Sequence, residues 1–169
     1  MIFSHKQVPG YWLPEDPRFP GTSNTLVKER VVQHGFVAWV KKNFDKDTMV
    51  LHLRTDVEKG VPDLLIGMEG FSLVMEMKKW GEKPTPLQFA FLTRFRNAGY
   101  MTGWAMDLMT AADFMLAFEA TVHHPTALCT QSCIVRRHEV YFHQLNGSQK
   151  KVLTGELSVD PLRMMAHRS

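Results

Sequence analysis

The first regular pattern of hydrophobic residues along this chain has a helical spacing. Apolar side chains recur every four residues, at Val32, Phe36, Val40 and Phe44. This spacing places them on one face of a helix. The pattern therefore predicts a helix over about residues 25–44.

Three short apolar runs follow this helix, and their lengths are typical of strands. They lie at residues 49–54, 63–67 and 71–79. The dipeptide Glu69-Gly70 separates the second run from the third, and a glycine at this place is typical of a two-residue hairpin turn. We therefore expect the second and third strands to pair as an antiparallel hairpin.

The next helix has the clearest start in the chain. Thr85 is a suitable N-cap residue, and Gln88, three residues later, completes a capping box. Gly99 stands where a helix stop is expected. The apolar stripe of this helix is predicted at Leu87, Phe91, Leu92 and Phe95.

The pattern continues with a strand and a helix and then weakens. Residues 100–106 predict a fourth strand, and residues 110–120 predict a helix with Thr110 as its cap. Residues 133–145 have room for one or two strands, whereas the final residues show little periodicity. The order of helix, three strands, helix, strand, helix and an appendage is that of a mixed α/β domain.

The chain divides into three parts by composition. Residues 1–24 hold four prolines, and such a density excludes regular structure, so we expect an irregular N-terminal arm. Residues 25–120 carry the periodic elements and form the expected core. Residues 121–169 are expected to be a C-terminal extension that packs on this core. A length of 169 residues suits this single core.

Composition and charge exclude some classes of protein and leave others open. No apolar run approaches the roughly 20 residues of a membrane helix, and the N-terminus lacks the features of a signal peptide. We therefore expect a cytoplasmic protein with no membrane partner. Two cysteines, Cys129 and Cys133, are too few for a disulfide-based fold. The formal net charge of +3 and the pI of about 8.9 permit a polyanionic partner without requiring one.

Candidate chemistry lies on the hairpin around Glu69-Gly70. A two-residue turn at this place puts Glu76 opposite Asp63. Lys78 lies two residues beyond Glu76 and shares its face, because side chains alternate along a strand. The other face is expected to be core, because three opposed pairs on it are apolar: Phe71 with Met68, Leu73 with Ile66, and Met75 with Leu64.

Two carboxylates held face to face need a cation between them. Opposed Cβ atoms are about 5 Å apart, a distance at which like charges are unfavourable. Mg²⁺ suits such a pair because it takes one or two carboxylates and keeps several waters, and Mn²⁺ is expected to substitute for it. Lys78 would then orient or deprotonate a bound water, or stabilise charge on a phosphate. The alternative is a solvated outer face on which Glu76 pairs with Lys78 or Lys79.

The hairpin carries a pattern that resembles the motif of the PD-(D/E)xK nuclease superfamily, namely Pro62-Asp63 followed by Glu76-Met77-Lys78. The wider runs at 60–66, 85–89 and 97–100 look like the VRR-NUC family within that superfamily, and the likeness covers about residues 25–120. The resemblance implies an α/β fold with a restriction-endonuclease-like core, made of a helix, a three-stranded β-meander, a helix and a strand. The mixed central sheet would be flanked by helices. The stretch before Pro62 is short, so the loop that helps to frame the substrate is expected to be reduced.

The resemblance also implies roles for the residues of the motif itself. Asp63 and Glu76 would bind the metal, together with the backbone carbonyl of Met77. Lys78 would be the catalytic lysine.

Two residues outside the motif match the family as well. Gln88 matches its glutamine near the site, and the alternative is a residue that only completes the capping box with Thr85. Glu29 matches the acidic residue on its first helix, which supports the metal or the water. The alternative for Glu29 is a solvated helix glutamate.

The function that the resemblance implies is metal-dependent hydrolysis of phosphodiester bonds in DNA. Stand-alone viral and bacterial members of the family cut structured DNA, including four-way junctions, and often form homodimers. We therefore expect a Mg²⁺-dependent endonuclease for branched DNA, with a homodimer as one expectation and the host cytoplasm as its location if the protein is phage-encoded. One alternative is a restriction-like or nicking nuclease that acts on duplex DNA. The other is a DNA- or partner-binding protein whose site is idle.

Two further groups of residues carry weaker indications. Lys79 and Lys83 lie near the motif in the chain and are candidates for phosphate contacts. The spacing of the two cysteines is looser than in the usual zinc-binding pair, and the chain has no second cysteine pair. We therefore do not favour a zinc site. Its candidate ligands are His123, His124, Cys129, Cys133 and His138.

Overall fold

The structure is a computed structural model that describes residues 29–53, 58–125, 134–143 and 148–166. The arm expected at residues 1–24 and both cysteines lie outside the described residues. No helix in the described part of the chain is long and apolar enough to cross a bilayer.

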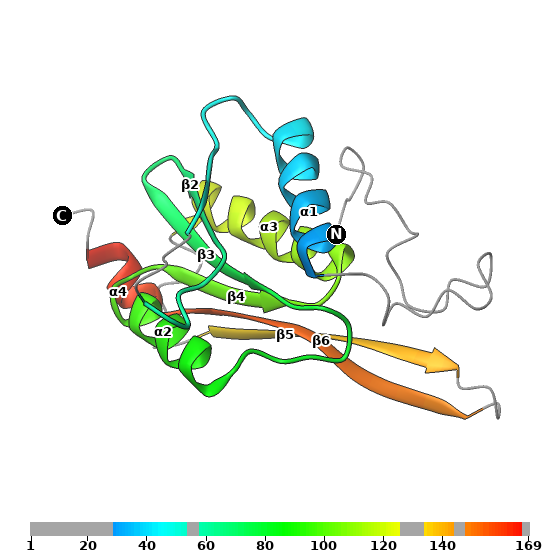
Figure 1. Ribbon diagram of the computed structural model, residues 1–169. Helices are drawn as coiled ribbons and strands as arrows, with labels where there is room; N and C mark the ends of the chain where they lie inside the picture. The colour runs from blue at the N-terminus through cyan, green and yellow to red at the C-terminus, as the bar shows by residue number, and fades with distance from the viewer. Residues whose placement is uncertain (1–28, 54–57, 126–133, 144–147, 167–169) are drawn as a thin grey trace.

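A six-stranded mixed sheet forms the centre of the molecule (Figure 1). Its strands are β1 (Met49–His52), β2 (Leu64–Met68), β3 (Phe71–Met77), β4 (Met101–Ala105), β5 (Ile134–His143) and β6 (Gln149–Val159). The helices are α1 (Glu29–Asn43), α2 (Pro86–Asn97), α3 (Leu108–His123) and α4 (Pro161–Ala166). The strand order is β1-β2-β3-β4-β6-β5. β3 and β4 are parallel, and the other neighbouring strands are antiparallel.

Helices pack on both faces of the sheet, which confirms the expected α/β class. α1 and α3 lie together on one face, while α2 lies on the other (Figure 1). The α1–α3 side holds the larger core, in which Phe36, Phe114 and Phe118 are fully buried. The α2 side holds a smaller core around Leu92 and Trp104. The sheet therefore has no solvated face along β3 and β4.

The β2–β3 hairpin has the predicted register. Glu69 and Gly70 both have positive φ angles, 48° and 80°, as a two-residue turn of type I′ requires. The three apolar pairs predicted for the core face are all formed. Met68 is half-buried, and the other five residues of those pairs are buried.

Two predictions for the helices are wrong. α3 begins at Leu108, and its cap is Asp107 rather than Thr110. The Asp107 carboxylate accepts from the backbone N–H of Thr110 at 2.8 Å, so Thr110 lies inside the first turn. Along α2 only Leu92 of the predicted stripe is buried, and Leu87 is 49% exposed. Phe95 is half-buried against the same cluster as Leu92, whereas the Leu87 side chain lies against Gly60.

The C-terminal residues join the central sheet, which their weak periodicity did not predict. β6 pairs with β4, and β5 pairs with β6. Most side chains along the second half of β6 are buried, so the alternation typical of a half-exposed strand is absent. Gly155 fits here because a Cβ atom would lie 2.4 Å from the carbonyl oxygen of Trp104.

Candidate active site

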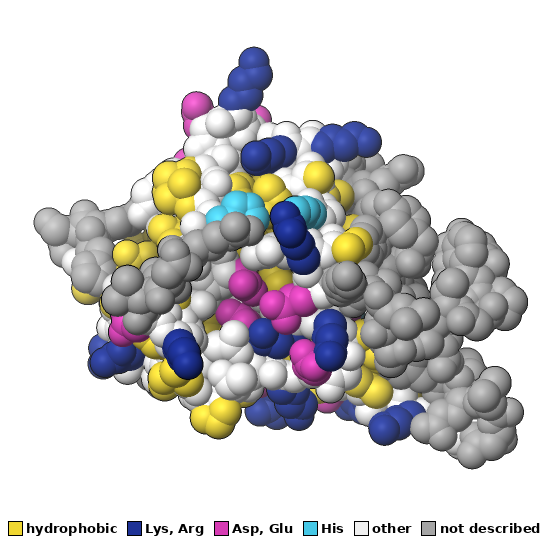
Figure 2. Space-filling model, in the orientation of Figure 1, with side chains coloured by type: hydrophobic (Ala, Val, Ile, Leu, Met, Phe, Trp, Pro, Cys, Tyr) yellow, Lys and Arg dark blue, Asp and Glu magenta, His cyan; other side chains and the backbone are white. Residues whose placement is uncertain are grey.

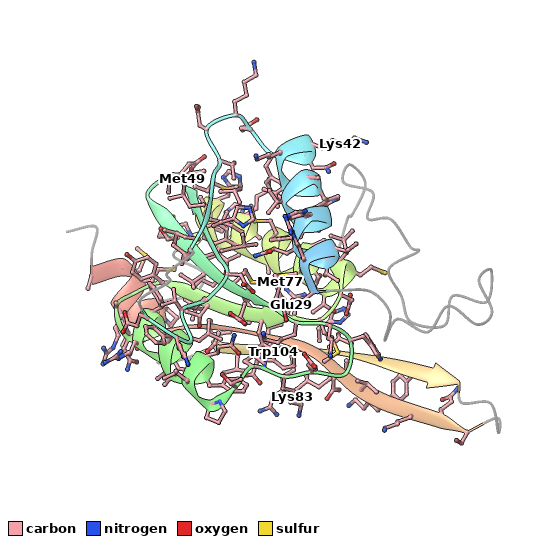
Figure 3. All side chains as sticks on the ribbon, in the orientation of Figure 1. Glu29, Lys42, Met49, Met77, Lys83 and Trp104 are labelled. Atoms are coloured by element: carbon pink, nitrogen blue, oxygen red, sulfur yellow. The ribbon has the colours of Figure 1, made fainter. Side chains whose placement is uncertain are left out.

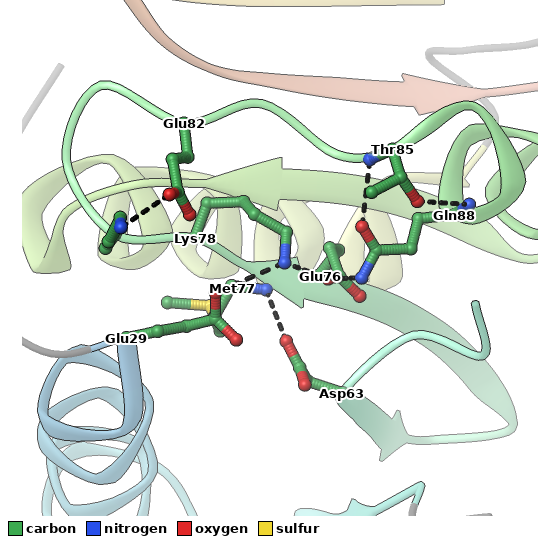
Figure 4. A network of polar contacts seen from close by, with 9 residues as sticks. Glu29, Asp63, Glu76, Met77, Lys78, Glu82, Thr85 and Gln88 are labelled. Atoms are coloured by element: carbon green, nitrogen blue, oxygen red, sulfur yellow. Dashed lines mark hydrogen bonds and ion pairs between the residues drawn. The ribbon is translucent and has the colours of Figure 1, made fainter. Parts of the chain in front are cut away.

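Side chains from four separate segments meet beside the carboxyl end of β3 (Figure 4). Glu76 lies within β3, and Lys78 follows its last residue. Asp63 directly precedes β2, and Glu29 is the first residue of α1. Gln88 enters from the first turn of α2. The structure thus brings together all five side chains that the sequence singled out. Figure 2 shows acidic side chains gathered near the middle of the face that it presents, with basic side chains around them.

Asp63 is fixed by a bond to the backbone of the neighbouring strand. The ladder between β2 and β3 ends at Leu64 and Met75, one pair short of Asp63 and Glu76. Instead, the Asp63 carboxylate accepts from the backbone N–H of Met77 at 2.8 Å. Burial raises the pKa of Asp63 above its usual range, although this hydrogen bond opposes the shift. Asp63 is therefore held beside β3 by the main chain and does not depend on a partner side chain.

Glu76 is the most deeply buried charged residue of the site. Its side chain is 1% exposed, and its Oε1 accepts from Lys78 and from Gln88. Its other oxygen, Oε2, is buried and has no hydrogen-bond partner among the described residues. Burial, followed by the negative charge of Asp63, raises the pKa of Glu76 to about 7. A buried oxygen without a partner is costly, so the site favours a proton or a cation at Oε2.

Lys78 lies between two carboxylates. Its Nζ is 2.8 Å from Oε1 of Glu76 and 3.2 Å from Oε2 of Glu29 (Figure 4). Burial lowers the pKa of Lys78, but the ion pairs with Glu76 and Glu29 outweigh burial, so the net shift is upward. Lys78 is therefore a cation held in a defined position. Glu29 contacts this lysine, as a supporting role requires, and its side chain remains 39% exposed to solvent.

Gln88 joins the start of α2 to the buried carboxylate. Its Oε1 accepts from the backbone N–H of Thr85 at 2.9 Å, which completes the capping box. Its Nε2 donates to Oε1 of Glu76. Gln88 therefore completes the capping box and also contacts Glu76. Because a backbone N–H can only donate, it fixes which end of the Gln88 amide faces Glu76.

The carboxylates and one backbone carbonyl form a set of oxygen ligands that suits a hard divalent ion. Asp63 and Glu76 supply carboxylates, and the unpartnered Oε2 of Glu76 is the atom that most needs a cation. In a strand the N–H and C=O of one residue point to the same side, so the carbonyl of Met77 faces the side of Asp63. Within the described residues there is no cluster of three or more His, Cys, Asp or Glu that would hold a metal. Two carboxylates, a carbonyl and waters are a set that Mg²⁺ accepts.

One residue near the site gave no indication in the sequence. His52 lies opposite Leu64 at the end of β1, and its charge lowers the pKa of Asp63. Its ring also meets that of His34 edge to face, with centroids 6.4 Å apart. The pairing of β1 with β2 places His52 next to Asp63. The β-meander implied by the family resemblance includes this pairing but does not give its register.

The remaining candidates lie apart from this cluster. Lys79 pairs with Glu82 at 2.6 Å, outside the cluster. Lys83 is exposed. His138 bonds through its Nδ1 to the hydroxyls of Thr110 and Thr154, and the two cysteines of the zinc hypothesis lie outside the described residues.

A scan of the chain against protein-family models finds no match, and a search of curated proteins finds none.

The double role of Gln88 leads to a prediction about metal binding. Replacing Gln88 with Ala removes the hydrogen bond that orients Glu76, and the loss of such a partner typically weakens metal affinity by about ten- to a hundredfold. The loss of the capping box should cost about 1 kcal/mol of stability as well. Mn²⁺ affinity measured by electron paramagnetic resonance, together with urea unfolding, separates the two effects.

Thr85→Ala is the matched control for this prediction. It removes the capping hydroxyl but keeps the backbone N–H that holds Gln88. We expect a similar loss of stability with unchanged Mn²⁺ affinity. If Thr85→Ala weakened Mn²⁺ binding as much as Gln88→Ala, the effect would come from helix stability and not from orientation of Glu76.

Proposed function

We propose that this protein is a metal-dependent endonuclease that hydrolyses phosphodiester bonds in DNA. The observation that carries the proposal is the buried Glu76, whose Oε2 has no partner among the described residues and which lies beside Asp63 and Lys78. Burying an unpaired carboxylate oxygen costs free energy, and binding a cation or a proton there offsets this cost. The resemblance of the motif to PD-(D/E)xK nucleases supports the same conclusion.

Each side chain then has a separate task. Mg²⁺ held by Asp63, Glu76 and the carbonyl of Met77 would supply Lewis acidity and an activated water. Lys78 places a fixed positive charge where negative charge develops on the phosphate. Glu29 holds Lys78 from the side of α1, and Gln88 holds Glu76 from the side of α2.

The substrate part of the proposal is DNA with a branch or junction, cut by a protein that forms a homodimer. Only the resemblance to the VRR-NUC family supports this finer assignment. Mn²⁺ is expected to replace Mg²⁺, because both ions accept carboxylate and water oxygens.

A cleavage panel tests the proposal. Labelled four-way junction, flap and plain duplex are each incubated with Mg²⁺, Mn²⁺ or EDTA. We expect cutting with either ion and none in EDTA, with the branched substrates cut fastest. Equal rates on all three substrates would instead assign the protein to duplex DNA, as a restriction-like or nicking nuclease.

A non-catalytic role is the second candidate, and one observation favours it. Lys78 already neutralises the site by pairing with Glu76 and Glu29, as a purely structural ion-pair network would. DNA that is bound but uncut in Mg²⁺ and in Mn²⁺ would support this role and contradict the nuclease.

A further inference from the structure

The outer half of the β5–β6 hairpin extends past the rest of the sheet. The pairing of β4 with β6 ends at Ala105 and Gly155, with one further hydrogen bond from Met106 to the carbonyl of Thr154. Among the described residues, residues 149–153 of β6 therefore pair only with residues 139–143 of β5. We call these two segments the outer ribbon. In Figure 1 this part of the hairpin projects beyond the body of the molecule.

The outer ribbon projects from the end of the sheet at which β3 and β4 finish, and the candidate site lies at this same end. β3 and β4 are parallel, and their last residues, Met77 and Ala105, are paired. Glu76 and Lys78 therefore lie at the end of the sheet past which residues 149–153 of β6 extend. β6 is two strands away from β3, which corresponds to about 10 Å, and five residues of strand reach about 17 Å further.

The surface of the outer ribbon suits a polyanion. Lys150 and Lys151 are exposed, and Tyr141 is 65% exposed. Consecutive residues point to opposite faces of a strand, so each face of the outer ribbon carries a lysine. The acidic residue in it is Glu139, which pairs with Lys151. Lysine ammonium groups and tyrosine hydroxyls are common donors to DNA phosphates.

The outer ribbon has the dimensions of an element that contacts a duplex. A two-stranded ribbon fits the major groove, which is about 12 Å wide. A two-stranded hairpin is also only marginally stable in water by itself. In the described part of the chain no third strand pairs with residues 139–143 or 149–153. Such an element gains stability from a partner that lies against it.

We propose that the outer ribbon binds the phosphate backbone of duplex DNA to one side of the cleaved bond. This inference rests on the proposed function for the position of the DNA. The lysines of the outer ribbon would hold the duplex about 15–20 Å from Glu76 and Lys78. It would contribute affinity and direction without taking part in the bond-breaking step.

The test compares two double variants that remove the same charge. Lys150→Ser with Lys151→Ser changes the outer ribbon. Lys41→Ser with Lys42→Ser changes two exposed lysines at the end of α1 that is far from Glu29, as Figure 3 shows for Lys42. Binding of a fluorescent duplex several helical turns long is measured in EDTA over a range of salt concentrations.

We expect the outer-ribbon variant to bind this duplex about ten- to a hundredfold more weakly than wild type, with a salt slope smaller by about two. The control variant should bind as wild type does. Cleavage of a dinucleotide diester, which is too short to reach the outer ribbon, should keep its wild-type rate in both variants. Sedimentation checks that the oligomeric state is unchanged.

The outcomes separate this inference from the proposed function. Equal losses in both double variants, or no loss in the outer-ribbon variant, would overturn the outer-ribbon site. A change in oligomeric state that accounts for the loss would overturn it too, in favour of a contact between copies of this chain. Failure of the wild type to cleave any DNA would overturn the nuclease but leave a specific outer-ribbon loss as support for DNA binding.

Discussion

A Lys78→Met variant is expected to cleave DNA about a hundred- to a thousandfold more slowly than wild type and to bind Mn²⁺ at least as tightly. Methionine keeps most of the volume of the buried side chain but removes its charge. The ammonium of Lys78 bonds Oε1 of Glu76, so it competes with a metal for that carboxylate in the free protein. Its removal therefore leaves the metal site more negative while it deprives the phosphate of a cation.

Lys79→Met is the matched control for this variant. It removes the neighbouring lysine, which is 47% exposed and pairs with Glu82 outside the cluster. Cleavage and Mn²⁺ binding should both stay near wild type. If Lys78→Met cut DNA at the wild-type rate, Lys78 would have no catalytic task. If instead it lost Mn²⁺ binding, its role would be to hold Glu76 in place.

Replacing Lys78 also removes the ion-pair partner of the buried Glu76 carboxylate, which typically costs about 3–5 kcal/mol. The variant should therefore be less stable than wild type in EDTA, and metal should restore much of the difference by binding the folded state. Urea unfolding with and without Mn²⁺ shows whether a low rate reflects chemistry or unfolding.

The hairpin that carries the site was predictable because two local rules agree on it. Glu69-Gly70 selects a two-residue turn, and the alternation of apolar residues on either side accepts one register only. Once that register is set, Glu76 and Lys78 must share the face opposite the core. The predicted pairing fails at Asp63. Its carboxylate accepts a hydrogen bond from the backbone N–H of Met77, and Asp63 is not paired with Glu76 in the β2–β3 ladder.

Contacts between distant segments were harder to predict. Glu29 is 49 residues from Lys78 in the chain, and its contact depends on how α1 packs over the sheet. The periodicity of α1 predicts which face of the helix is buried. It does not predict which residue lies at the end of the helix that is close to Lys78. Only the family resemblance pointed to Glu29. No sequence pattern pointed to His52, whose position beside Asp63 follows from the pairing of β1 with β2.

The C-terminal strands illustrate a different limit. β6 enters the sheet beside β4 and is largely buried over its second half, so its hydrophobic pattern does not alternate there. Thr154 and Gly155 are buried there although neither is strongly apolar. Thr154 is accommodated by hydrogen bonds to His138 and Thr110, and Gly155 by its close approach to Trp104. Such burial depends on partners that a local window along the sequence does not contain.

In EDTA, the folded state is expected to lose about 2.5 kcal/mol of stability between about pH 5 and about pH 8 through Glu76 alone. Its pKa is raised from 4.5 to about 7 in the folded state, because burial and the charge of Asp63 favour the protonated form. A raised pKa contributes stability that is fully present below the unfolded value and is lost as the pH rises through the folded value. Asp63 shifts in the same direction. Lys78, whose pKa is raised from 10.5, keeps its contribution throughout this range.

Urea unfolding at several pH values, with and without Mn²⁺, measures this loss. Glu76→Gln should remove most of this loss and leave the smaller part that Asp63 contributes, whereas Glu82→Gln, which changes an exposed carboxylate, should leave the wild-type slope. Mn²⁺ should restore the stability of the wild type at the alkaline end but have little effect on Glu76→Gln, because ionised Glu76 is the group that the metal stabilises. A wild-type curve that stayed flat in EDTA would mean that Glu76 is not held in a costly environment. The argument that this carboxylate is buried in order to bind a cation would then lose its basis.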